Sequence, residues 1–190
     1  MEIAGNVKTI KKNNKKRNNK KTQKNKQECV YIFGYGSLMS EKSRFKTHKQ
    51  ESKAYPVVVN KHFGYKRCWN TLIPNNKIVL GLEKNNKKNT PINGILFKVC
   101  KCCYKRFLER EKRYEEKKVD KSCIRFLKNK PKDFNTLKVV TFVTKDKHNL
   151  NKMEPDPKRY IPSYYVNLVL EGISSFDKNF QNSFLKHTYC

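Results

Sequence analysis

Residues 30–38 read VYIFGYGSL, and this stretch decides how the rest of the chain is interpreted. Its first four residues are an apolar run typical of a buried strand, and Gly34 and Gly36 stand on either side of Tyr35 in the turn that follows. Such a turn brings several backbone N–H groups and the hydroxyl of Ser37 close to one point, where a small acidic ligand can be held. Many strands also end in Gly-x-Gly as a plain structural turn, so the stretch alone leaves both interpretations open.

A second segment, far along the chain, favours the ligand-binding interpretation of this turn over the plain structural one. Residues 107–114 read FLEREKRY and close a short helix that the pattern predicts over residues 104–114. Together with YGSL at 35–38, this segment resembles the γ-glutamylcyclotransferase-like superfamily, whose members carry Tyr-Gly-Ser-Leu or Tyr-Gly-Ser-Asn after the first strand and a catalytic glutamate in a later segment. FGYGSL at 33–38 is similar to the form found in the glutathione-directed branch. The resemblance covers roughly residues 29–188, and its further blocks, in order, are GYKRCWN at 64–70, LG at 80–81, NGILF at 93–97, Tyr165 and VLEG at 169–172.

This resemblance implies an α+β fold, a small mixed β-barrel with peripheral helices. It also implies an enzyme that cyclises the γ-glutamyl group of a γ-glutamyl peptide or amine, with glutathione as one candidate, to 5-oxoproline with release of the amine. Glu111 matches the family's catalytic glutamate and is the expected general acid/base, a role that calls for a raised pKa. The expected substrate-binding residues are Tyr35, Gly36, Ser37, Leu38, Tyr114 and Tyr165. The reaction requires no metal or cofactor.

The residues taken without the resemblance leave alternatives open. Glu111 lies in a lysine-rich segment, where a glutamate usually pairs with solvent-exposed charge. Tyr35 and Tyr165 suit pocket-lining hydroxyls and equally suit core aromatics with one hydrogen bond, and the same holds for Tyr114. Two departures from the family pattern, FL at 107–108 and KR at 112–113, bear on the geometry of the helix end.

Apolar periodicity predicts the remaining elements. Strands are expected at 30–33, 56–59, 78–82, 94–99 and 138–143, with a weaker candidate at 119–126. Helices are expected at 104–114, 162–173 and 176–185, and Arg44 is expected to brace the first loop. Many strands with few helices favour α+β over a doubly wound sheet. The buried stripe predicted for the helix at 162–173 consists of Val166, Val169, Leu170 and Ile173.

The formal net charge of +28 is extreme for 190 residues. It fits either a solvated, lysine-rich surface or contact with a polyanion such as RNA or an anionic membrane. Residues 8–26 consist almost only of Lys, Asn, Thr and Gln, so a disordered basic tail is expected over residues 1–28, followed by one domain over 29–190. The alternative function is therefore a catalytically silent family member that binds RNA or another polyanion through its lysines, with the tail making non-specific contacts.

Deletion of residues 1–27 is expected to leave the melting temperature and the activity nearly unchanged, because the segment has too few apolar residues to pack on a core. A thermal melt and a rate measurement on the truncated chain check this. A fall of many degrees would contradict it. If the tail carries polyanion contacts, the same deletion weakens RNA binding and reduces its salt dependence.

Seven cysteines without a secretory segment predict reduced thiols in a cytoplasmic protein, and basic clusters at 15–17 and 20–21 leave nuclear import open. No apolar run is long enough for a transmembrane helix, so no membrane association is expected. The oligomeric state is left open. Cys100, Cys102 and Cys103 invite a metal interpretation, but Cys-Lys-Cys-Cys does not show the usual spacer of paired zinc ligands. Because the four histidines stand apart in the sequence, no metal site is predicted, and a buried strand end that runs into a helix is expected instead.

Overall fold

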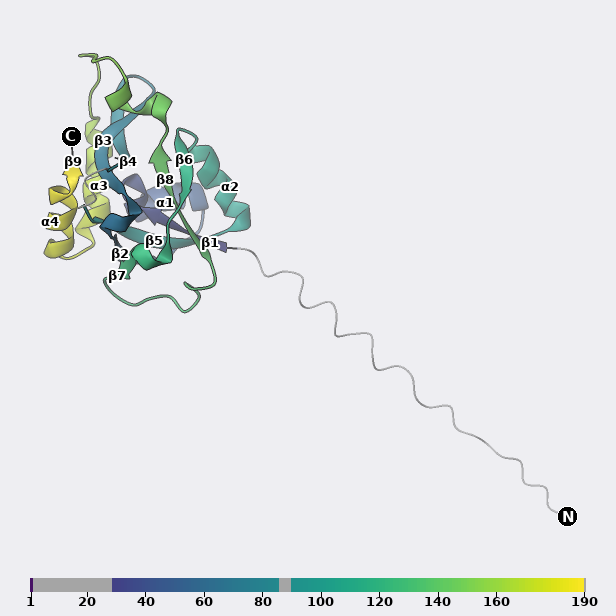
Figure 1. Ribbon diagram of the computed structural model, residues 1–190. Helices are drawn as coiled ribbons and strands as arrows, with labels where there is room; N and C mark the ends of the chain where they lie inside the picture. The colour runs from purple at the N-terminus through teal and green to yellow at the C-terminus, as the bar shows by residue number, and fades with distance from the viewer. Residues whose placement is uncertain (2–28, 86–89, 190) are drawn as a thin grey trace.

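The computed structural model of the chain describes residues 1, 29–85 and 90–189 (Figure 1). The predicted basic tail therefore lies outside the described residues, except for Met1 and the boundary with the first strand. An exposed hairpin tip is also expected from the polar residues 84–89, and residues 86–89 of that segment lie outside the described residues.

Two sheets form the centre of the described part of the chain. In the larger, six-stranded sheet, β1 (Cys29–Gly34) lies inside and pairs antiparallel with β5 (Ile92–Cys100) and parallel with β8 (Lys138–Thr144). β2 (Ala54–Val59) lies between β5 and β7, and the edge strands are β6 (Tyr114–Lys118) and β7 (Ile124–Phe126). The smaller sheet has the order β4-β3-β9 and consists of β3 (Tyr65–Ile73), β4 (Lys77–Lys84) and β9 (Thr188–Tyr189).

Helices lie around these sheets, with α3 and α4 on one side and α2 on the other (Figure 1). Their bounds are α1 (Glu41–His48), α2 (Lys101–Arg110), α3 (Ser163–Ser174) and α4 (Lys178–Lys186). The predicted α+β fold with peripheral helices is confirmed. Among the described residues the strand ladders form two separate sheets and do not close into the expected barrel.

None of the helices in the described ranges has the length and apolar character needed to cross a membrane.

The helix predicted over 104–114 is wrong at both ends. The observed α2 begins at Lys101 and ends at Arg110, and Glu111 follows as its C-terminal cap with φ −92° and ψ 23°. Tyr114 then opens β6, which pairs antiparallel with β8. The sequence of β6, YEEKK, has no apolar alternation, so its strand conformation comes from the backbone ladder that β8 offers at the sheet edge. The weaker strand candidate at 119–126 is confined to its last three residues, β7.

The helix predicted at 162–173 is confirmed as α3, but its buried stripe differs. Leu170 is 44 % exposed, whereas Tyr165 and Gly172 are buried beside Val169 and Ile173. A Cβ at Gly172 would lie 2.7 Å from the backbone nitrogen of Ser40, so glycine lets α3 pack directly on the loop after β1. The buried face of α3 is therefore rotated relative to the predicted one, and Tyr165 faces that loop.

Arg67 on β3 ties the two sheets and the C-terminal helix together. Its side chain is fully buried and donates hydrogen bonds to both oxygens of Asn93 on β5, to the carbonyl of Phe184 in α4 and to the hydroxyl of Thr188. The guanidinium also lies 3.5 Å from the centroid of the Phe184 ring. A buried cation is stable only when such acceptors surround it, so these contacts depend on one another.

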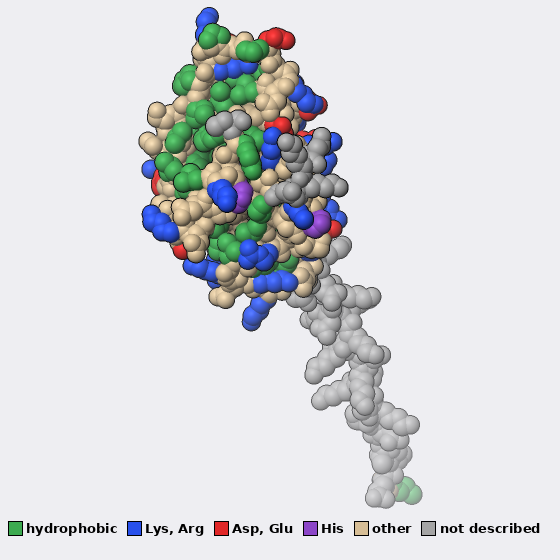
Figure 2. Space-filling model, turned by 60° about the vertical axis from the view of Figure 1, so that its left-hand side comes forward, with side chains coloured by type: hydrophobic (Ala, Val, Ile, Leu, Met, Phe, Trp, Pro, Cys, Tyr) green, Lys and Arg blue, Asp and Glu red, His purple; other side chains and the backbone are tan. Residues whose placement is uncertain are grey.

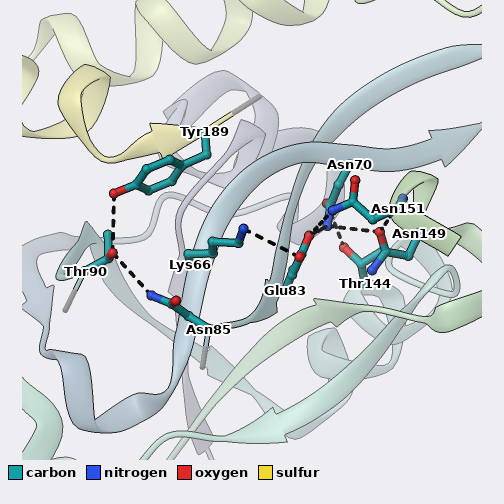
Figure 3. A network of polar contacts seen from close by, with 9 residues as sticks. All are labelled: Lys66, Asn70, Glu83, Asn85, Thr90, Thr144, Asn149, Asn151 and Tyr189. Atoms are coloured by element: carbon teal, nitrogen blue, oxygen red, sulfur yellow. Dashed lines mark hydrogen bonds and ion pairs between the residues drawn. The ribbon is translucent and has the colours of Figure 1, made fainter. Parts of the chain in front are cut away.

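A network of polar side chains joins β3 and β4 to β8 and the segment that follows it (Figure 3). Asn70 donates to the carboxylate of Glu83 at 3.1 Å and accepts from the hydroxyl of Thr144 at 3.3 Å. Thr144 is also 2.7 Å from the hydroxyl of Thr71. These groups close around Gly81 on β4, where an added Cβ would overlap Thr144, Thr71 and Asn70.

Gly81→Ala is expected to destabilise the fold strongly, by about 3 kcal/mol or more, because the new methyl group has no space and the polar atoms it displaces lose their partners. Chemical denaturation followed by circular dichroism measures this change. Gly64→Ala is the matched control, since Gly64 has φ +76° but nothing within 4 Å of an added Cβ. It should cost only about 1 kcal/mol, the usual penalty of a left-handed residue. Equal losses in the two variants would contradict the steric explanation.

Lysine and arginine side chains are spread over the face shown in Figure 2 and are not gathered into one stripe there. On that face, the even spread of positive charge is what we expect of a solvated basic surface. A nucleic-acid-binding groove would instead concentrate the positive charge along one path.

Candidate active site

The predicted site residues come together where the loop after β1, the end of α2 and the start of α3 meet. They line one small cavity of about 30 Å³, together with aromatic and aliphatic side chains of β1, β4 and β8. The lining residues are Phe33, Tyr35, Gly36, Ser37, Leu38, Leu80, Glu111, Tyr114, Phe142 and Tyr165. All seven residues predicted from the sequence are among them, although they lie up to 130 positions apart. Their roles in binding and catalysis remain predictions.

Glu111 is positioned by the turn between α2 and β6. Its backbone N–H donates to the carbonyl of Phe107, and its own carbonyl accepts from Tyr114, so the turn fixes the direction of its side chain. Only 12 % of that side chain is exposed. Burial raises the pKa of Glu111, and the guanidinium of Arg110, 3.0 Å away, acts in the opposite direction. The result is a carboxyl group with a pKa above its ordinary value, which suits a group that takes up and returns a proton.

Arg110 was not predicted from the sequence, yet it connects the carboxylate to the first loop. While its Nε pairs with Glu111, its Nη2 donates to the hydroxyls of Ser37 at 3.1 Å and Ser43 at 2.8 Å. Its Nη1 donates to the carbonyl of Ser43 and the hydroxyl of Thr47, both in α1. No sequence motif marks an arginine for this role, because its partners in the first loop and α1 lie more than 60 residues away.

The three tyrosines differ in their hydrogen bonds. Tyr35 donates to the carbonyl of Phe142 at 2.6 Å, and Tyr114 donates to the carbonyl of Leu80 at 3.0 Å. Burial raises the pKa of both hydroxyls well above the ordinary value, so both remain protonated at neutral pH. Tyr35 and Tyr114 are therefore buried aromatics with a satisfied hydroxyl as well as cavity-lining groups, which combines the two interpretations that the sequence left open.

The hydroxyl of Tyr165 lies at the turn after β1, where the sequence analysis expects a ligand to bind. Its hydroxyl interacts with the backbone and side chain of Ser37 and with the backbone of Leu80, while burial raises its pKa to about 12. A Cβ added at Gly36 would lie only 3.1 Å from the Tyr165 hydroxyl oxygen. Gly36 itself has φ −133°, so glycine is needed here for this close approach and not for a left-handed turn.

Arg44 braces the first loop, as predicted. Its Nη1 donates to the carbonyls of Leu38 at 3.0 Å and Met39 at 2.8 Å, and its side chain is buried. Ser40 begins α1 by accepting from the backbone N–H of Ser43. The loop that carries Gly36, Ser37 and Leu38 is thus held in place by hydrogen bonds from Arg44 and by packing against α3.

A larger hollow lies elsewhere, between α1, the start of β2 and the end of α3. Its volume is about 560 Å³, and its lining includes Glu41, Glu51, Lys53 and Glu171. None of the seven predicted site residues lines it. Charged groups of both signs surround it, whereas Glu111 is the single charged residue that lines the small cavity, so the chemistry of the two hollows differs.

Solved structures similar to this chain were found, although no protein-family model matches the sequence and no curated protein is significantly similar to it. A structure described as gamma-glutamyl cyclotransferase superposes with a TM-score of 0.58 at 11 % identity, over 83 % of this chain and 87 % of that one. The gamma glutamyl cyclotransferase specific to glutathione from yeast gives a TM-score of 0.55 at 10 % identity, over 85 % and 97 %.

A third similar structure is YkqA from Bacillus subtilis, with a TM-score of 0.56 at 17 % identity. The match covers 84 % of this chain and 54 % of YkqA, so this chain spans about half of that longer protein. At such identities the comparisons establish the fold and leave the activity open. The chain has the γ-glutamylcyclotransferase-like fold.

Proposed function

We propose that the chain, through a domain over residues 29–190, is a γ-glutamylcyclotransferase that converts the γ-glutamyl group of a small peptide or amine to 5-oxoproline. The observation that carries this proposal is the position of Glu111, a nearly buried carboxylate at the cavity that also contains Gly36, Ser37 and Leu38. The fold shared with γ-glutamyl cyclotransferases supports it. A cytoplasmic location is part of the proposal and rests on Cys100, Cys102, Cys103 and Cys123, which form no disulfide among the described residues.

In the proposed reaction, Glu111 acts twice. Its carboxylate first removes a proton from the α-ammonium group of the substrate, which makes the nitrogen nucleophilic. That nitrogen attacks the γ-carbonyl carbon of the same molecule, the five-membered lactam closes, and the bond to the leaving nitrogen breaks. The carboxylic acid of Glu111 returns this proton to the leaving nitrogen as its bond breaks. Glu111 then carries the second proton from the ring nitrogen to the released amine, so that a neutral lactam and an ammonium result.

The first loop supplies the complementary part of the mechanism. Backbone N–H groups of Gly36, Ser37 and Leu38 stabilise the oxyanion that develops on the γ-carbonyl or bind the α-carboxylate of the substrate. Ring closure is intramolecular, so a site that fixes the glutamyl rotamer contributes much of the acceleration.

Substrate entry requires a rearrangement of the cavity. A volume of about 30 Å³ holds one or two water molecules and is too small for a glutamyl group. The hydroxyl of Tyr165 interacts with Ser37, where the substrate oxygen would bind. Binding therefore displaces Tyr165 from the loop, and its hydroxyl then becomes available to the substrate.

The proposal is tested by release of 5-oxoproline from glutathione, γ-glutamyl-alanine and γ-glutamyl-lysine, measured side by side by chromatography. Turnover of at least one of the three that depends on enzyme concentration supports the proposal and identifies the substrate class. If the folded protein releases 5-oxoproline from none of them, the proposal is wrong for these classes of substrate.

Arg110→Met is expected to move the acidic limb of the pH profile of kcat/KM toward higher pH. Glu111 acts as a base only when it is ionised, so activity is lost as the pH falls through its pKa. Burial already raises this pKa, and removal of the opposing guanidinium raises it further. Arg113→Met is the control, since it removes a nearby positive charge without breaking the ion pair at Glu111. An unchanged limb in Arg110→Met, or an equal displacement in Arg113→Met, would contradict the assignment.

A further inference from the structure

Cys100 and Cys103 lie close together at the start of α2. The sequence analysis did not recognise this arrangement. Cys100 ends β5 and is the N-terminal cap of the helix, and Cys103 is its third helical residue. Side chains at these two positions face each other in helix caps. Two residues separate Cys100 from Cys103, the usual spacer of paired zinc ligands, and Cys102 stands between them.

His48 does not stand apart from these cysteines. It is the last residue of α1, only 5 % exposed, and its ring lies edge-on against Phe107 of α2. A ring nitrogen of His48 and the Sγ atoms of Cys100 and Cys103 all lie within 4.8 Å of one another. The buried Nδ1 of His48 has no hydrogen-bond partner among the described residues. A buried nitrogen in this state costs free energy unless something binds it, which points to a ligand.

Cys102 supplies a fourth donor on the solvent side. Its Sγ lies 2.8 Å from that of Cys100 and 3.7 Å from that of Cys103, and the residue is exposed. Three donors, His48, Cys100 and Cys103, thus converge where α1 meets α2. Cys102 lies beside the two sulfur atoms at an exposed position, where it can complete the set Cys₃His and provide an entry path.

We propose that Cys100, Cys102, Cys103 and His48 bind one zinc ion. Cys₃His is a donor set of structural zinc sites, and tetrahedral Zn–S bonds of about 2.3 Å place the sulfur atoms about 3.7 Å apart. The Cys102–Cys103 separation of 3.7 Å already has that value, whereas the Cys100–Cys102 separation of 2.8 Å has to widen by about 0.9 Å. The separations among His48, Cys100 and Cys103 are at most 4.8 Å and need a contraction of no more than about 1 Å.

The surroundings favour the charge of this site. Three thiolates and Zn²⁺ carry one net negative charge, which the N-terminus of α2 and the nearby Arg106 stabilise.

The metal would act as a structural clamp. α2 begins at this site and ends beside Glu111, and α1 carries both His48 and the partners of Arg110. A zinc ion therefore links the two helices that position the carboxylate, at the end of α2 opposite the candidate active site. The inference does not depend on the proposed cyclisation.

The test is zinc content and cobalt spectroscopy on the full chain, purified under reducing conditions from zinc-supplemented cells. We expect one zinc per chain by mass spectrometry of metals, and a higher melting temperature with zinc than after chelation. Titration of the metal-free chain with Co²⁺ should give thiolate-to-cobalt charge-transfer absorption and the visible bands of a tetrahedral ion.

Variants separate the site from adventitious binding. Cys100→Ser, Cys103→Ser and His48→Gln should each lose the bound zinc or bind it at least about 100-fold more weakly. Cys102→Ser, at an exposed position, should keep the fold and lose about one third of the charge-transfer intensity, since one of three thiolates is gone. Cys123→Ser is the control, because Cys123 is buried in a hydrophobic cluster that includes none of the proposed ligands. This variant should leave the metal content and the spectrum unchanged.

Two results would overturn the proposal. One is a folded, reduced chain that retains no zinc and gives no tetrahedral cobalt spectrum. The other is a Cys100–Cys102 disulfide, detected by mass spectrometry as the loss of two hydrogens, in protein kept under the reducing conditions that preserve thiols elsewhere in the chain.

Discussion

Glu111→Gln should abolish cyclisation while the fold remains intact. The amide keeps the shape of the side chain but cannot take a proton from the substrate ammonium or return one to the leaving amine. Loss of a general base typically lowers the rate by about 10²- to 10⁴-fold, and here the same group performs both proton transfers. The measurement is kcat for 5-oxoproline release on the best substrate, with circular dichroism to confirm the fold.

The matched control is Glu109→Gln, which removes an exposed carboxylate two residues earlier at the end of α2. It should retain nearly full activity. Near-full turnover by Glu111→Gln would remove Glu111 from the mechanism, and an equal loss in both variants would point to the charge of the helix end.

Gly36→Val should eliminate activity more completely than Ser37→Ala. A Cβ at Gly36 would lie 3.1 Å from the Tyr165 hydroxyl and 3.4 Å from the Cβ of Leu80, and the two methyl groups of valine extend further. They would fill a cavity that already has to widen for the substrate. Ser37→Ala instead removes one hydroxyl, which accepts a hydrogen bond from Arg110, and leaves the backbone N–H groups in place. A hydrogen bond of this kind contributes about 0.5–1.5 kcal/mol, so a loss of about 2- to 13-fold is expected.

Steady-state kinetics on both variants, with circular dichroism as the folding control, measure the difference. The loss in Ser37→Ala should fall mainly on KM if the loop holds the α-carboxylate of the substrate. An inactive Ser37→Ala beside an active Gly36→Val would mean that the serine hydroxyl takes part in the chemistry, and the role assigned to the loop backbone would be wrong.

The sequence predicted the central strands well because they are buried on both faces. Runs such as VYIF at 30–33 in β1 and ILF at 95–97 in β5 are apolar regardless of their neighbours, so composition alone identifies them. β6 was missed because it is an exposed edge strand held by backbone pairing with β8, and its side chains carry no pattern. α1 was missed for a similar reason, since its sequence, EKSRFKTH, has little amphipathic character and buries Arg44 and His48.

The site was predictable only where a motif marked it. YGSL and the later glutamate are recognisable in sequence, and the fold brings them to one cavity. Arg110 and His48 have partners more than 50 residues away, so only tertiary structure reveals what they contact. The position of the Tyr165 hydroxyl likewise depends on how α3 packs against the first loop through Gly172.

The contacts of Arg67 have a consequence for how the chain folds during synthesis. β3 is made early, but the acceptors that surround its buried guanidinium include Phe184 and Thr188. Until these late residues have left the ribosome, Arg67 must stay hydrated, and the smaller sheet cannot close over it. Domains usually fold as units while the chain emerges, and this one should complete its core only after Phe184 and Thr188 have emerged. Nascent chains that stall before α4 should therefore be sensitive to proteases along β3, even though all the residues of the candidate active site have already been made.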